Sequence, residues 1–459
     1  MTTTDVASEV WRQCVDAARL YRGKPSTQTL FEVFRTISAT EELWRDPRAP
    51  TADPLSRFSI FEAALEAHDA DRAISAAIDA LSLVQDLYER TALRIAMASR
   101  AQLVHQATPL AMKVLTEGRA TDEWPADTAI DHFLFRMRCR VVADDNEALL
   151  QQIIASDHPL ASACALEWKR ARWRCEGPSQ GLVRDNLALA RQFKRNGRLL
   201  QECLSQAFLA DRELVDPLLQ EFPDLARAHS KLLPLARHLR DHPDLIGTAL
   251  DRAEISRHAA LLESFENGTE SMTAMIASDA SLAIVGNSPC ERGQGAGPAI
   301  DAHDHVARFK YFPLVTEPDP DYGAKFTIHV RSPQANPKQD AASLAAKWCV
   351  PCQADFTYRV GGWEHWFSLQ QRGATLACLP PGANVALRRR LQAEPSLGLA
   401  FLTYVKDVQG VLRRGQCFGF SFVDQIGPEA TSAHYFDARR PALTHRWTEE
   451  RAIFDAMVS

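Results

Sequence analysis

The apolar pattern of the chain changes near residue 270, and this change limits the folds that the sequence can adopt. Before it, from residue 10 to about 262, apolar residues recur at three- and four-residue spacing with few β-branched clusters. The stretch DADRAISAAIDALSLVQDLYERTALRIAMASRAQLV is the clearest example. This spacing predicts amphipathic helices. We therefore expect residues 1–270 to form an all-α domain, a solenoid or an irregular bundle, and no clean repeat period assigns it to a known repeat class.

Residues 271–459 have the pattern of an α/β domain. The segment ENGTE, residues 266–270, interrupts the helical spacing and is predicted to be a linker. Beyond it β-prone runs alternate with helical ones, which predicts a largely parallel sheet with ligands bound beyond the carboxyl ends of its strands. The expected strands are 282–285, 306–311, 326–330, 356–360, 374–379 and 417–423, and the expected helices are 341–348, 384–391 and 397–412.

The composition excludes several classes of protein. Of the 459 residues, 46% are hydrophobic and 24% are charged, and the formal net charge is -6. This is the balance of an ordinary globular protein and gives no indication of a nucleic-acid surface. The first residues lack the basic start and apolar core of a signal peptide, and no run reaches the roughly eighteen apolar residues of a membrane span. We therefore expect a cytoplasmic protein.

The ten cysteines are scattered without regular spacing, which predicts reduced thiols rather than a disulfide framework. The segment WCVPC, residues 348–352, is similar to the redox motif of thioredoxins, but β-prone residues follow it instead of a helix. No second CxxC and no nearby histidine pair completes a zinc site. We expect Cys349 and Cys352 to be buried structural thiols.

The stretch AIVGNSPCERGQGAGPAIDAHDHVARF, residues 283–309, contains the first indication of a ligand site. A strand that ends in Gly286-Asn287-Ser288 offers backbone N–H groups, an amide and a hydroxyl to a phosphate or a nucleotide sugar. The glycines that follow do not form GxGxxG, and the chain contains no GxxxxGK. On these residues alone, a glycine-rich surface turn explains the pattern equally well.

A longer pattern around this stretch resembles the large sialylmotif of animal-type sialyltransferases. The matching residues are Gly286-Asn287-Ser288, Gly297, Ile300-Asp301, His303-Asp304, Val306, Arg308, Asp321, Gly323, Lys325, Thr327 and His329. The family's other motifs have counterparts in the same order. Pro395-Ser396-Leu397-Gly398 with Cys417-Phe418-Gly419-Phe420 looks like the small motif, His434-Tyr435-Phe436-Asp437 like the third, and His445 with Glu450 like the last. The resemblance covers about residues 278–459.

This resemblance implies a Rossmann-like glycosyltransferase fold, a variant of the GT-A class, that needs no metal ion or other cofactor. It implies transfer of a sialic acid from CMP-sialic acid to a glycan hydroxyl with inversion. By its match, His445 would be the general base, since histidine titrates near neutral pH. His434 would stabilise the charge on the departing CMP.

The resemblance also assigns donor-binding residues. Asn287 and Ser288 would hold CMP, while Ser396 and Gly398 would line the pocket at a helix N-terminus that favours an anion. The donor-binding set is Gly286, Asn287, Ser288, Lys310, Ser396, Leu397, Gly398, Gly419 and Phe420.

The supporting set is Asp301, His303, Asp304, Arg308, Tyr435 and Glu450. For Asp301, His303 and Asp304 we favour capping and loop hydrogen bonds over ligand binding. Arg308 is expected to pair with one of these acids, and Glu450 to orient its surroundings. We expect His329 to be a hydrogen-bonded histidine of the sheet.

The sequence departs from the family at three places. Leu282 and Leu412 stand where animal members have a disulfide, and their burial would contribute about 2–3 kcal/mol instead. Lys310 replaces an asparagine that faces the donor phosphate, so it would either meet the phosphate or change the donor. Pro289 restricts Ser288 to extended geometry.

Two alternatives to a sialyltransferase stay open at this point. CMP also carries Kdo and other nonulosonic acids, so a CMP-Kdo transferase of bacterial surface polysaccharide assembly is the nearest one. The other is a non-catalytic CMP-binding module on a helical scaffold. The expected partners are a CMP-sugar donor and a glycan or lipid-linked saccharide acceptor at the inner face of the membrane, with no nucleic acid. The helical half would bind the acceptor, a partner or the membrane face.

Overall fold

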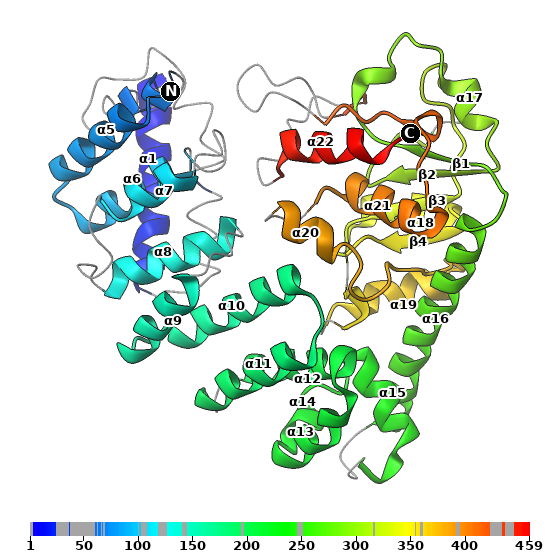
Figure 1. The fold of residues 1–459 in the computed structure, drawn as a ribbon, viewed down its shortest axis with the longest axis horizontal. Coiled ribbons are helices and arrows are strands. Elements are labelled where there is room, and N and C mark those ends of the chain that lie inside the picture. Colours follow the sequence, from blue (N-terminus) through cyan, green and yellow to red (C-terminus); the bar gives the residue numbers. More distant parts are fainter. Residues whose placement is uncertain are drawn as a thin grey trace. The chain divides into compact units, whose positions relative to one another are not determined.

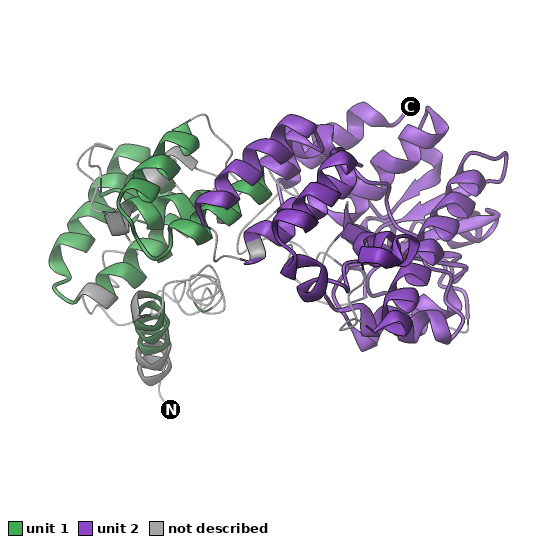
Figure 2. Ribbon diagram, turned by 90° about the horizontal axis from the view of Figure 1, so that it is seen from below, with its two compact units in different colours: residues 1–171 green, residues 172–459 purple. Residues whose placement is uncertain are grey.

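The structure is a computed structural model, and it describes most of the chain. The described residues are 3–23, 36, 60–61, 63–65, 67, 69–99, 101, 108–117, 126–139, 145–193, 197–245, 251–314, 317–353, 355–358, 361–391, 395–422, 434–436 and 445–459. The chain divides into two compact units, residues 1–171 and 172–459 (Figure 2). Each unit is described by itself below.

The first unit is helical throughout its described residues. Its helices are α1 (Thr3–Gly23), α5 (Ala70–Leu83), α6 (Leu87–Ser99), α7 (Thr108–Leu115), α8 (Ala126–Cys139), α9 (Asp145–Ala155) and the first part of α10 (Ala161–Glu176). Asp69 caps α5 by accepting the N–H of Arg72 at 3.1 Å. Inside the unit, the buried Asp131 accepts hydrogen bonds from Tyr21 at 2.6 Å and from Arg94 at 2.5 Å. The predicted all-α character of this region is confirmed for these residues.

The second unit begins with helices and continues into a sheet. Its first helices are α11 (Gln180–Gln192), α12 (Gly197–Ala210), α13 (Val215–Glu221), α14 (Asp224–Ala228), α15 (Leu233–Asp241) and α16 (Arg252–Ile276). Later helices are α17 (Gly297–Asp301), α18 (Asp340–Ala345), α19 (Trp363–Gln371), α20 (Val385–Leu391), α21 (Leu397–Gln409) and α22 (Trp447–Met457). Short 3-10 turns are Arg212–Leu214, Pro243–Leu245, Pro289–Glu291, Pro337–Gln339, Phe356–Tyr358 and Arg414–Gln416. None of the helices in the described part of the chain is long and apolar enough to cross a membrane.

Five parallel strands form the sheet of this unit in the order β4-β3-β2-β1-β5. The strands are β1 (Leu282–Val285), β2 (His305–Phe309), β3 (Ile328–Arg331), β4 (Trp348–Pro351) and β5 (Cys417–Phe418). Figure 1 shows β1 to β4 following one another across the sheet. The α/β part of the prediction is therefore confirmed.

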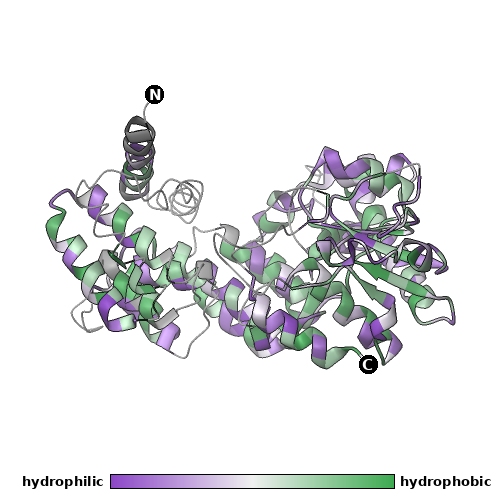
Figure 3. Ribbon diagram, turned by 90° about the horizontal axis from the view of Figure 1, so that it is seen from above, coloured by the Kyte–Doolittle hydropathy of each residue, from purple (hydrophilic) through white to green (hydrophobic). Residues whose placement is uncertain are grey.

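Both faces of the sheet are buried, as the continuous apolar run of β1 requires. Ile284 and Val330 belong to a core that also contains residues of α21 and α22, among them Phe401 and Phe454. Ala283 and Val285 face the other way and pack with Ile300, Val306 and Tyr322. The sheet region of Figure 3 is accordingly coloured largely as hydrophobic. Leu282 and Leu412 are both buried in the first of these cores, so the expected apolar burial of these two leucines is confirmed.

Several predicted elements differ from the structure. Residues 356–358 form a 3-10 turn instead of a strand, and Val360 lies outside the described residues. Residues 374–379 make only one bridge, between Leu376 and Cys349. The helix predicted for 341–348 ends at Ala345, and Trp348 begins β4. β4 was not predicted, because its four residues, WCVP, belong to a segment that is similar to the redox motif of thioredoxins.

The linker predicted at 266–270 is wrong, because these residues lie inside the 25-residue helix α16. The predicted domain boundary at 270 therefore falls within a helix, and the division between the compact units follows Ala171. The linker was predicted because of Gly268, since a glycine normally weakens a helix. Here the glycine allows close packing, since a methyl group on Gly268 would lie 2.0 Å from the carbonyl oxygen of Leu376.

This packing predicts opposite effects for two helical glycines. Gly268→Ala should lower the free energy of unfolding by about 1–3 kcal/mol, because the added methyl group collides with backbone. In the control Gly181→Ala, at the start of α11, the methyl group would have no neighbour within 4 Å. It should leave stability unchanged or raise it by up to about 1 kcal/mol. Urea unfolding of the full chain measures both, and equal effects would contradict the proposed contact.

Candidate functional site

The candidate site lies where the order of the strands reverses. From β1 the chain adds β2, β3 and β4 on one side of the sheet, and β5 returns to the other side of β1. Ligands of open α/β sheets bind beyond the carboxyl ends of the strands at such a switch point. Gly286–Ser288 follows β1 at this place, and Gly419-Phe420 follows β5.

Backbone hydrogen bonds join these two segments directly. The N–H of Gly286 donates to the carbonyl of Phe418 at 2.8 Å, and the N–H of Ser288 donates to the carbonyl of Gly419 at 3.1 Å. A methyl group on Gly286 would lie 2.3 Å from the carbonyl oxygen of Gly419. Gly419 itself has a φ of 67°, which favours glycine. Neither glycine can be replaced without separating the segments.

Phe420 connects the strand ends to the N-terminus of α21. Methyl groups on Gly286 and Gly398 would lie 3.0 Å and 2.8 Å from the same ring carbon of Phe420. The ring also contacts the rings of Phe309 and Phe454. The structure therefore brings together Gly286, Gly398, Gly419 and Phe420, while Leu397 packs against the core below.

Asn287 and Ser288 are held mainly by protein groups. The side-chain amide of Asn287 donates to the carbonyls of Phe309 at 3.0 Å and Tyr311 at 3.2 Å, which fixes the chain after β2. The hydroxyl of Ser288 lies 2.6 Å from that of Ser421. The N–H groups of the Asn287 side chain are therefore engaged within the protein.

Tyr435 places the third motif-like segment beside Asn287. Its N–H donates to the carbonyl of Asn287 at 2.8 Å, and its ring stacks on Tyr322 with the centroids 3.8 Å apart. Arg292 donates to the carbonyl of Tyr435. His434 precedes Tyr435 in the chain, and its ring stacks on that of Phe436. Asp437 lies outside the described residues.

Glu450 joins His445 to the N-terminus of α21. Ser396 caps α21 by accepting the N–H of Leu399 at 3.3 Å, and its own N–H donates to Oε1 of Glu450 at 2.9 Å. The same oxygen lies 3.6 Å from Nδ1 of His445. Glu450 is 0% exposed, and this burial raises the pKa of its carboxyl group to about 7. Both polar groups of Ser396 are therefore engaged within the protein.

The predicted supporting acids have the capping roles that we favoured. Asp301 accepts the N–H groups of Ala324 and Lys325, the latter at 2.8 Å. Asp304 accepts the N–H and the hydroxyl of Ser281, both at 2.8 Å, and His303 binds the carbonyl of Ala299 at 2.9 Å. His303 and Asp304 precede β2, so they lie at the amino edge of the sheet, away from Gly286.

Three further predictions concern β2 and β3. The expected pairing of Arg308 with an acid is wrong, since this buried side chain donates to the carbonyls of Lys325, at 3.0 Å, and Tyr322. His329 is a hydrogen-bonded sheet residue as predicted, contacting Ser343 at 3.0 Å and the Lys310 carbonyl at 2.8 Å. Burial lowers its pKa to about 4. Lys310 follows β2 with a φ of 52°, at the same edge of the sheet as Asn287.

The prediction that Cys349 and Cys352 are buried structural thiols is confirmed. Cys349 lies within β4 and is 0% exposed, and burial raises the pKa of Cys352 to about 12. A strand at this position cannot acidify a thiol as a helix N-terminus does. No group of three or more histidine, cysteine, aspartate or glutamate side chains suited to a metal ion occurs among the described residues.

Sequence inspection missed residues that fix the site through tertiary contacts. Glu291 accepts the N–H of Gly419 at 2.9 Å, and Tyr322 donates to the carbonyl of Ser288 at 2.7 Å. Ser421 contacts Ser288. Of these three residues, only Tyr322 could have been suspected from the sequence, because it directly precedes Gly323 of the large motif-like pattern.

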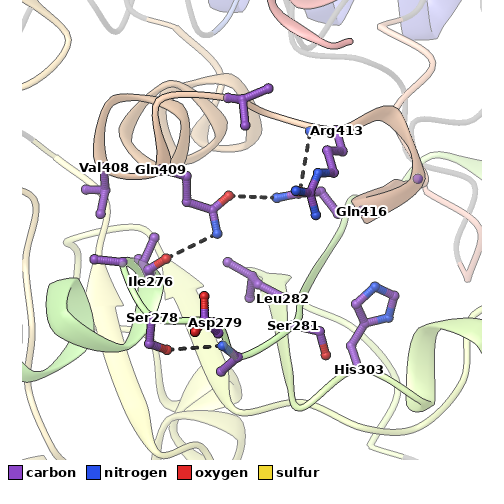
Figure 4. Close-up of a pocket in the computed structure, with 14 residues that line it drawn as sticks. Ile276, Ser278, Asp279, Ser281, Leu282, His303, Val408, Gln409, Arg413 and Gln416 are labelled. Carbon is purple, nitrogen blue, oxygen red and sulfur yellow. Dashed lines mark hydrogen bonds between the residues drawn. The ribbon is translucent and has the colours of Figure 1, made fainter.

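A pocket of about 520 Å³ lies at the opposite, amino edge of the sheet (Figure 4). Its polar side chains largely bond with one another and with backbone. Gln409 donates to the carbonyl of Ile276 at 3.1 Å and accepts from Gln416 at 3.1 Å. Another pocket, of about 500 Å³, lies along α16 and is lined by residues that include Glu270, Tyr358 and Pro380. His303 of the predicted supporting set lines the first pocket, and neither pocket includes Gly286, Asn287, Ser288, Ser396, Gly398, Gly419, Phe420, His434 or His445.

The burial of Glu450 predicts how stability changes with pH. The carboxyl group of Glu450 binds a proton more tightly in the folded protein, where its pKa is about 7, than in the unfolded chain, where its pKa is near 4.5. The contribution of Glu450 to the free energy of unfolding therefore falls by about 3 kcal/mol between pH 4.5 and pH 7 and then levels off. Glu450→Gln should remove this fall, whereas the exposed neighbour Glu449→Gln should retain it. Urea unfolding from pH 5 to 8 measures the difference, and parallel curves for the wild type and Glu450→Gln would contradict it.

Comparison of the chain with protein-family models, with curated proteins and with solved structures finds no match.

Proposed function

We propose that the second unit transfers a sugar from a CMP-activated donor to a hydroxyl group of a glycan or a lipid-linked saccharide. The resemblance to sialyltransferases suggests this activity, and one observation carries it. Four motif-like segments that are widely separated in the sequence meet around the carboxyl ends of β1 and β5. Contacts of Tyr435 with Asn287, of Phe420 with Gly286, and of Glu450 with Ser396 and His445 join them.

The surrounding architecture fits the proposal. A parallel sheet with buried faces and a switch point beside β1 is compatible with a Rossmann-like variant of the GT-A glycosyltransferase class. Leu282 and Leu412 in one core suit a compartment in which the disulfide of the animal family would not form. We place the reaction in the cytoplasm, at the inner face of the membrane.

In the proposed reaction, His445 removes the proton from the acceptor hydroxyl as its oxygen attacks the anomeric carbon of the donor. The bond from that carbon to the CMP phosphate oxygen breaks, and its electron pair leaves with CMP. His434 donates a hydrogen bond to the phosphate as this charge develops. Lys310, at the same edge of the sheet, supplies a positive charge. Attack opposite the leaving group inverts the configuration.

The donor would be a CMP-linked sialic acid, with CMP-Kdo as the alternative, because both offer the same nucleotide, carboxylate and anomeric chemistry. Specificity for cytidine would come from the segments Gly286–Ser288 and Gly419-Phe420. The side-chain amide of Asn287 and the backbone N–H of Ser396 donate within the protein, so we do not assign nucleotide contact to these donors.

Nucleotide binding tests the donor class. CMP should raise the melting temperature of the full chain more than UDP or GDP, because a ligand at 100 times its Kd stabilises the folded state by about 2.7 kcal/mol. Thermal shift at matched concentrations measures this preference. Equal shifts for the three nucleotides, or none, would overturn the proposal. A CMP preference without transfer from either CMP-sialic acid or CMP-Kdo would instead favour a binding module.

Substitution of the histidines tests the catalytic assignment. His445→Ala should lower kcat by about 10²–10⁴-fold with either CMP sugar, since it removes the base. His434→Ala should also lower kcat, because the leaving phosphate loses a donor. The control His229→Ala, at the end of α14, should leave turnover unchanged. Unchanged kcat in His445→Ala would remove this residue from the mechanism.

A further inference from the structure

A buried carboxyl group with one unfilled oxygen lies beside the proposed base. Glu450 is in the first turn of α22, and its Oε1 contacts both the N–H of Ser396 and Nδ1 of His445, at 2.9 Å and 3.6 Å. Its other oxygen, Oε2, is buried and has no hydrogen-bond partner among the described residues. Leaving such an oxygen unfilled costs free energy, so packing alone does not explain a glutamate at this position.

The groups that act on Glu450 come from three segments. Within α22, the negative charge of Glu449 raises the pKa of Glu450, although burial has the largest effect. From α21, the N–H and hydroxyl of Ser396 lower it. The imidazole of His445 lies on the segment before α22, and Arg446 follows it with its carbonyl accepting the N–H of Glu450. Glu450 thus changes charge near neutral pH, in the range where histidine does so.

We propose that Glu450 is a positioning residue for His445, whose ionised carboxylate orients the imidazole through Nδ1 and stabilises the imidazolium formed during transfer. This inference rests on the proposed function. The acceptor oxygen bonds to the anomeric carbon, CMP leaves with the electron pair of the broken bond, and the acceptor proton moves to Nε2 of His445. The imidazolium and the carboxylate then form a neutral pair, so the protein holds no uncompensated buried charge.

In this arrangement, a proton bound by the pair can reside on the carboxylate of Glu450 or on the imidazole of His445. When the pair already holds a proton, at lower pH, His445 can no longer accept one from the acceptor. In the proposed pair, the imidazole and the carboxylate lie 3.6 Å apart and would titrate together, in two macroscopic steps. The imidazole signals of His445 should therefore respond to pH twice in the wild type.

NMR titration of the full chain tests the pair without relying on transferase activity. Comparison with His445→Gln assigns the His445 signals. We expect two steps in the wild type and in the exposed control Glu449→Gln, and a single step in Glu450→Gln, whose amide cannot ionise. The same titration in the wild type and Glu450→Gln would overturn the inference. If Glu450→Gln fails to fold, Glu450→Asp replaces it, and loss or shift of one step by the shorter carboxylate supports coupling whereas an unchanged curve refutes it.

Kinetics supply the second readout. Glu450→Gln should lower kcat about 10- to 1,000-fold with little change in KM for the CMP sugar, and it should shift the acidic limb of the pH profile to lower pH, because the imidazolium loses its carboxylate partner. Glu449→Gln should retain both. If the wild type transfers no CMP-linked sugar, the proposed function fails, while the NMR titration still decides whether Glu450 and His445 are coupled.

Discussion

The close backbone approach after β1 and β5 is the constraint on which the candidate site depends. Two N–H groups, of Gly286 and Ser288, donate across this junction, and the space beside Gly286 is too small for a methyl group. β5 is the last strand in the described part of the chain, and its junction with β1 brings the segment that follows it to the end of β1. A side chain at Gly286 or Gly419 would widen this junction. It would also displace Tyr435, whose N–H donates to the carbonyl of Asn287.

Most residues around the junction build it through contacts with one another. Asn287, Ser396 and Tyr435 direct their hydrogen-bonding groups at neighbouring segments, and Phe420 fills the space between two glycines. Rigid placement of this kind suits a site whose work is to hold two reactants in line. Nδ1 of His445 lies 3.6 Å from Glu450, and the ring of His434 stacks on Phe436.

Much of this arrangement could be predicted from the sequence where a local pattern specifies it. The apolar run of β1 and the alternation of strands and helices predicted a parallel sheet, and the order of the motif-like segments singled out Asn287 and Tyr435, which a backbone hydrogen bond joins. Other features depend on distant contacts and have no local signal. Gly268 looks like a break in a helix until its contact with Leu376 is known, and Glu291 becomes a partner of Gly419 only in the folded chain. β4 is too short, and too similar to a redox motif, for its sequence to identify it.

The continuity of α16 has a consequence for where the chain can be cut. Phe265 and Leu262 in its middle pack with Trp363 and Trp366, while Met272 and Ile276 near its end belong to the core with Leu282. A fragment that began after residue 270 would keep every motif-like segment yet leave the tryptophan face of the sheet domain exposed to water. Truncated forms of the sheet domain should therefore keep the whole of α16, so that the indole rings keep their cover.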